Sequence, residues 1–98
     1  MTDKELKRLA QEATGIDDAT QAIEETLRTY VEVKLDQYRV VIRKYEGQYG
    51  FGFEHFSSRL GRDLPLSWEN EQVYLTWEEA LTHVAYFEEL VSQLSVHA

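Results

Sequence analysis

The segment 38–55, YRVVIRKYEGQYGFGFEH, constrains the fold most, because bulky side chains alternate along it with small or polar ones. Residues 38–45 are rich in β-branched and aromatic side chains, which favour strands. Glu46-Gly47 then supplies a two-residue hairpin turn, and residues 48–55 return as a second strand. An alternation of period two puts one bulky face inward and leaves the other face bare. The pattern therefore predicts an antiparallel hairpin.

The turn sets the register of this predicted hairpin. Pairing about Glu46-Gly47 places the rings of Tyr49, Phe51 and Phe53 on the core side. It also sets Arg39 opposite Glu54, and opposite charges across an antiparallel pair are favourable.

Two helices are predicted ahead of the hairpin. Thr2 and Glu5 form a capping box for a helix over about 3–13, and Gly15 supplies the left-handed residue that ends it. A second helix begins at Asp17 or Asp18, with Gln21 at the capping-box position relative to Asp18, and extends to about residue 34. Its end is ambiguous, because residues 31–35 also alternate as a strand would.

The rest of the chain predicts a long loop, a short strand and a final helix. The polar stretch 57–71 contains the only proline, and residues 72–75 form the third strand. Thr76 and Glu79 make a second capping box, after which Ala80, Val84 and Phe87 recur at helical spacing.

These elements predict an α+β fold in the order ααβββα. It consists of two N-terminal helices, a three-stranded antiparallel β-meander, and a C-terminal helix packed on the sheet. We expect a single domain over 1–98, with 1–15 as a peripheral helix and 17–95 as an αβββα core.

Composition limits the class of protein. The chain of 98 residues is 43% apolar, which suits a packed core. It has no cysteine, which excludes a disulfide framework and a cysteine-ligated zinc site. There is no signal-peptide pattern and no apolar run of the roughly 18 residues that a membrane span needs. We therefore expect a soluble, cytoplasmic protein that does not enter a membrane.

The net charge of −8 is unevenly distributed. Residues 1–36 carry nine acids and five bases (−4), residues 37–62 two acids and five bases (+3), and residues 63–98 seven acids and no Lys or Arg (−7). An excess of negative charge disfavours binding to nucleic acid, whose affinity comes largely from neutralised phosphates. The basic centre keeps that possibility open locally.

Two stretches of the chain resemble RNA-binding families, but each departs from the family pattern at charged positions. The stretch 49–56, YGFGFEHF, is similar to the signature of an RRM strand, but Tyr49 replaces the basic residue and Glu54 would be buried. The αβββα order also resembles a double-stranded-RNA-binding domain. That family has a lysine cluster at the start of its last helix, whereas this chain has Trp77-Glu78-Glu79 at that position.

The bare outer face of the predicted hairpin is a candidate site for an anion or a partner. Its arginines would stand over glycines, which allow close approach by a ligand, and arginine forks suit carboxylate or phosphate. The alternative is structural, with Arg39 paired to Glu54 and the glycines only relieving crowding. The candidate residues are Arg39, Arg43, Gly50, Gly52, Arg59 and Arg62.

No constellation of residues indicates catalysis. The histidines are His55, His83 and His97, of which His83 follows Glu79 by four residues, where a surface hydrogen bond is the expected role. There is no H-E-x-x-H sequence, phosphate-binding loop or nucleophile elbow. We expect no enzyme activity, no metal and no cofactor.

The sequence therefore favours a non-catalytic regulatory or interaction protein that acts through protein–protein contacts with an unidentified partner. The acidic C-terminal third would supply the contact, through Glu78, Glu79, Glu88 and Glu89. The alternative is nucleic-acid or anion binding through the arginine-lined outer face of the sheet. The sequence does not decide between a monomer and a homodimer, because the first helix has enough apolar surface to pack either on a copy of itself or on its own domain.

Overall fold

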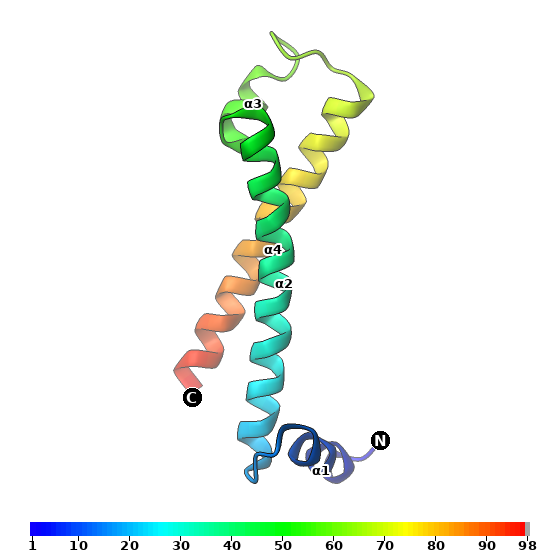
Figure 1. Ribbon diagram of the computed structural model, residues 1–98, viewed down its shortest axis with the longest axis vertical. Helices are drawn as coiled ribbons and strands as arrows, with labels where there is room; N and C mark the ends of the chain where they lie inside the picture. Colours follow the sequence, from blue (N-terminus) through cyan, green and yellow to red (C-terminus); the bar gives the residue numbers. More distant parts are fainter. Residues whose placement is uncertain (98) are drawn as a thin grey trace. The chain divides into compact units, whose positions relative to one another are not determined.

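A computed structural model describes residues 1–97, with the side chains of residues 1–94. This part of the chain forms four helices, α1 (Asp3–Thr14), α2 (Ala19–Tyr49), α3 (Phe53–Arg59) and α4 (Trp68–His97), and contains no strand (Figure 1). The predicted α+β fold with its three-stranded meander is therefore wrong, since the described chain is all-α.

The residues form two compact units. The first comprises Met1–Lys34 with the chain from Phe87 onward, and the second comprises Leu35–Tyr86. Helices α2 and α4 each contribute residues to both units, and we describe each unit by itself.

In the first unit, α1 confirms the predicted helix. The hydroxyl of Thr2 accepts a hydrogen bond from the backbone N–H of Glu5 at 3.1 Å. Gly15 ends the helix in the left-handed region, with φ 71°, and its N–H donates to the carbonyl of Gln11. The predicted start of α2 is also confirmed, because the Asp18 carboxylate accepts from the N–H of Gln21 at 2.8 Å.

In the second unit, the predicted first strand, 38–45, lies inside α2. The inward side chains recur three and four residues apart, which is a helical stripe. Val40, which the hairpin would turn inward, is 55% exposed, and Lys44 is exposed as well. The predicted end of this helix at residue 34 is therefore fifteen residues too early, because the β-branched composition of 38–45 favours a strand whereas the period of its inward residues is helical. The inward residues are Leu35, Tyr38, Ile42, Tyr45 and Tyr49.

The predicted second strand, 48–55, is the end of α2 followed by the start of α3. Gly50 stops α2 because its φ is 77°, and its N–H donates to the carbonyl of Glu46 at 2.8 Å. Gly47, which the predicted hairpin placed in its turn, is a helical residue.

The predicted third strand, 72–75, lies in α4. This helix begins at Trp68, and the hydroxyl of the preceding Ser67 accepts a hydrogen bond from the N–H of Asn70 at 3.1 Å. The predicted cap at Thr76 is therefore wrong, because Thr76 lies inside the helix. The long predicted loop is reduced to a connection over 60–67.

Trp77 is the centre of the second unit. Its side chain is fully buried, and four rings from α2 and α3 surround it. Their centroids lie between 5.5 and 6.2 Å from that of Trp77. The rings belong to Tyr45, Tyr49, Phe53 and Phe56. Large rings packed at these distances bury much apolar area and favour specific relative orientations.

No helix among residues 1–97 has the length and unbroken apolar character that crossing a bilayer requires.

Two alanine substitutions test the helical assignment of the segment predicted as a hairpin. Gly47→Ala should stabilise the protein by about 0.5–1 kcal/mol, since a methyl group there meets nothing within 4 Å and alanine favours helix. Gly50→Ala should destabilise it by about 1–2 kcal/mol, because its φ is positive. Urea unfolding measures both. Destabilisation by Gly47→Ala would contradict the helix and fit a turn.

Substitution of Trp77 tests the aromatic core. Trp77→Ala should cost about 3–5 kcal/mol of unfolding free energy. Trp77→Phe should cost clearly less, since the buried indole N–H has no hydrogen-bond acceptor among the described residues and phenylalanine removes that unpaired donor. Urea unfolding measures both losses. If Trp77→Phe lost as much unfolding free energy as Trp77→Ala, the indole N–H would instead have a hydrogen-bond acceptor.

Candidate protein-binding surface

The connection between α3 and α4 is held by its own backbone. The N–H groups of Arg62 and Leu64 both donate to the carbonyl of Arg59, at 2.9 and 3.1 Å. Gly61, with φ 87°, donates to the carbonyl of Leu64 at 2.7 Å. The Leu66 side chain lies in van der Waals contact with the position that a Cβ of Gly61 would occupy. The connection therefore has a fixed shape.

The start of α4 is tied to the same connection. The side-chain amide of Asn70 donates to the carbonyl of Pro65 at 2.8 Å, and the N–H of Ser67 donates to the same carbonyl at 2.9 Å. Arg59 adds an ion pair, with its Nε 3.3 Å from the Asp63 carboxylate. Its guanidinium also lies 5.1 Å from the ring centroid of Phe51.

Large apolar side chains are exposed on this framework. Leu66 is 67% exposed, Trp68 is 74% exposed and Leu75 is 56% exposed. With Leu60 they line an open depression of about 410 Å³. We call this the Trp68 surface, defined by Leu60, Leu66, Trp68 and Leu75, with Glu71, Gln72 and Tyr74 at its edge. Exposed apolar residues gathered in one place are typical of interaction sites.

Tyr74 connects this surface to the aromatic core. Its ring lies 5.2 Å from that of Phe53, centroid to centroid. Its hydroxyl interacts with the side chain of Glu78, one turn further along α4, and with that of Ser57 in α3. The hydrogen bond to Glu78, together with that residue's negative charge, raises the pKa of Tyr74 above its usual 10.0, and the contact with Ser57 opposes this shift.

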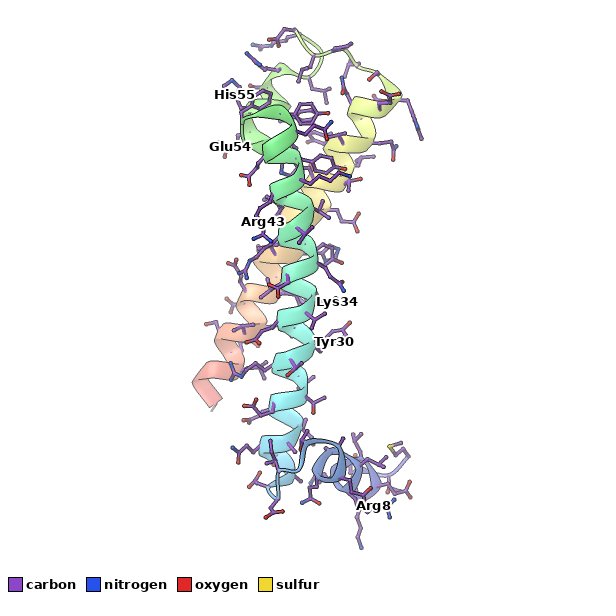
Figure 2. The ribbon with its side chains drawn as sticks, viewed as in Figure 1. Arg8, Tyr30, Lys34, Arg43, Glu54 and His55 are labelled. Carbon is purple, nitrogen blue, oxygen red and sulfur yellow. The ribbon has the colours of Figure 1, made fainter. Side chains whose placement is uncertain are left out.

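The six residues of the predicted arginine site all belong to the second unit but do not form the predicted face. Because there is no sheet among the described residues, the arginine-lined outer face of a sheet does not exist, and Arg39 does not oppose Glu54 across strands. Arg39 and Arg43 lie one turn apart on α2, and Figure 2 shows Arg43 projecting away from the helix. Arg59 is paired with Asp63.

The remaining residues of that site have local structural roles. Gly50 ends α2 and Gly52 precedes α3 in an extended conformation, with φ −82°. Arg62 lies in the connection and is exposed. Glu54, the predicted partner of Arg39, lies with His55 on the outer side of α3 (Figure 2).

The four predicted acidic contacts are divided between the units. Glu78 and Glu79 belong to the second unit, and Glu88 and Glu89 belong to the first. All four are exposed. Glu78 lies near the Trp68 surface, since it interacts with the hydroxyl of Tyr74.

The histidines form no described metal site. The Nε2 of His83 lies 3.5 Å from the carboxylate of Glu79, and its ring stacks on Tyr38 at 4.6 Å. The ring of His55 lies 4.9 Å from that of Phe51. No group of three possible metal-ligating side chains occurs among the residues searched, and the side chain of His97 lies outside those described.

Sequence analysis missed the apolar residues of the Trp68 surface. The stretch LPLSW was assigned to a polar loop, although three large apolar residues within five positions of a loop form an available signal. Leu75 was assigned to a strand. Its spacing of seven residues from Trp68 places both on one face of a helix, but only if the helix has begun by residue 68.

No family model, curated protein or solved structure matches this chain. Its function is therefore inferred from its own residues.

The hydroxyl of Tyr74 offers a test of this geometry. Because its folded pKa is raised, the stability that it contributes is present below the unfolded pKa and is lost as pH rises through the folded pKa. Wild type should therefore lose more unfolding free energy than Tyr74→Phe between pH 9 and pH 11, around the ordinary pKa of about 10. In ¹³C NMR titration, Glu78→Gln should lower the pKa of Tyr74. An unchanged pKa would exclude contact with Glu78.

Proposed function

We propose that this protein is a non-catalytic interaction protein that acts through protein–protein contacts, and that it binds its partner with the Trp68 surface. The observation that carries the proposal is a tryptophan exposed on a fixed framework. Trp68 is 74% exposed beside Leu66 and Leu75, while the other tryptophan is fully buried.

The energetics of interfaces support a role for these residues. Tryptophan is enriched among the few residues that dominate binding free energy, and such residues lie in well-packed patches that exclude water. The hydrogen bonds of the connection hold the Trp68 surface in one shape before binding, which lowers the entropic cost of association. The cytoplasmic location expected from the sequence stays a prediction and is part of this proposal.

Paired substitution of the two most prominent residues of α4 tests the proposal. Trp68→Ala with Leu75→Ala should weaken binding of the partner isolated from the native cell by about 30-fold or more, the loss expected for a dominant contact. Isothermal titration with the purified partner measures it. The fold should be retained, since both side chains are exposed.

Tyr30→Ala is the matched control, because it truncates an exposed aromatic residue on α2 in the first unit, and it should leave the partner's affinity unchanged. The proposal fails if the partner binds the double variant as tightly as wild type. It also fails if the protein has no partner and turns over a metabolite.

A further inference from the structure

Three of the exposed apolar side chains of α4 form a line along its outer face. Trp68 and Leu75 are two turns apart, and Tyr86, 59% exposed, continues the line at the end of the second unit. The face toward Trp77 and Ala80, both buried, lies on the opposite side of the helix. At 1.5 Å per residue, the line from residue 68 to residue 86 is about 27 Å long. An extended or helical segment of similar length would fit along this line of side chains.

Negative charge lies beside this line. Glu71 and Glu78 are two turns apart on one flank, within about 60° of Leu75 around the helix axis, and Glu79 lies close to the line itself. All three are exposed. The sequence from residue 63 to its end has no Lys or Arg. Of the two arginines just before it, Arg59 is paired with Asp63, and Arg62 is exposed in the connection.

From this juxtaposition we infer that the Trp68 surface binds a basic amphipathic segment of a partner protein, which rests on the proposed function. Apolar side chains of that segment contact Trp68 and Leu75. Its Lys or Arg side chains face Glu71 and Glu78. Complementary charge selects this partner and speeds its association, while the apolar contact supplies most of the affinity.

Charge also argues against the other occupants of this surface. Two copies that paired through the same patch would bring Glu71 and Glu78 of each against those of the other, because a two-fold interface is self-complementary. Like charges brought together in this way disfavour association. The phosphates of nucleic acid would meet the same repulsion.

Defined peptides test the inference. The probe is a synthetic peptide of about 18 residues, matched to the length of the line, with leucine on one helical face and lysine on the other. A second peptide has glutamate in place of lysine, and a third has serine in place of leucine. Titration calorimetry measures affinity. Acrylamide quenching of tryptophan fluorescence reports on Trp68, because Trp77 is fully buried.

The leucine–lysine peptide should bind and protect Trp68 from quenching, and the leucine–glutamate peptide should not bind. Glu71→Gln with Glu78→Gln should weaken binding about threefold to tenfold at low salt, and much less at high salt. Glu25→Gln with Glu32→Gln is the matched control, because it removes two exposed acids at the same spacing on α2 in the first unit, and it should change affinity less than about twofold.

Four outcomes would overturn the inference. They are equal binding of the glutamate peptide, equal binding of the serine peptide, no binding of the lysine peptide, and protection of Trp68 by concentrating the protein alone. The last would identify a second copy as the occupant. None of these outcomes would by itself contradict the proposed function. That function is tested separately, by the affinity of the partner from the native cell for the variant Trp68→Ala with Leu75→Ala.

Discussion

The packing of rings around Trp77 is the interaction on which the second unit depends. Helix α3 has only seven residues, too few to persist in water without packing, and its buried Phe56 lies against the indole of Trp77. The position of α3 in turn fixes Arg59, whose carbonyl and guanidinium hold the connection to α4. The exposed residues of the Trp68 surface therefore keep their arrangement because the buried Trp77 anchors α3.

Helix α4 divides its apolar residues between two faces in this unit. One face carries Trp77 and Ala80 into the core, and the other leaves Trp68 and Leu75 exposed to water. A helix that is apolar on both sides favours association, and the acids along α4 limit which associations are favourable. In the proposed function, exposed apolar area and negative charge act together, because the first would give affinity and the second would restrict the partner.

Much of the first unit could be predicted from the sequence, whereas the fold of the second could not. The caps at Thr2, Gly15 and Asp18 are local hydrogen bonds between neighbours in the chain, so local sequence is sufficient to identify them. The segment 38–55 was assigned wrongly because period two and a period near 3.5 both fit its apolar residues. The choice depends on what those residues contact, and the partner of Tyr45 and Tyr49 is Trp77, which is distant in sequence.

The error in the fold affected the two sequence-based site predictions differently. The arginine site required a particular strand register, so it lost its basis because residues 38–55 contain the end of α2 and the start of α3 rather than two strands. The excess of acids after residue 62 is a count along the chain and does not depend on secondary structure. The apolar residues of the surface were not predicted from the sequence, because Leu75 lies on the same face as Trp68 only when residues 68–75 are helical. The proposed selection of a partner by charge therefore follows from the count of acids alone, whereas the proposed place of contact depends on residues 68–75 being helical.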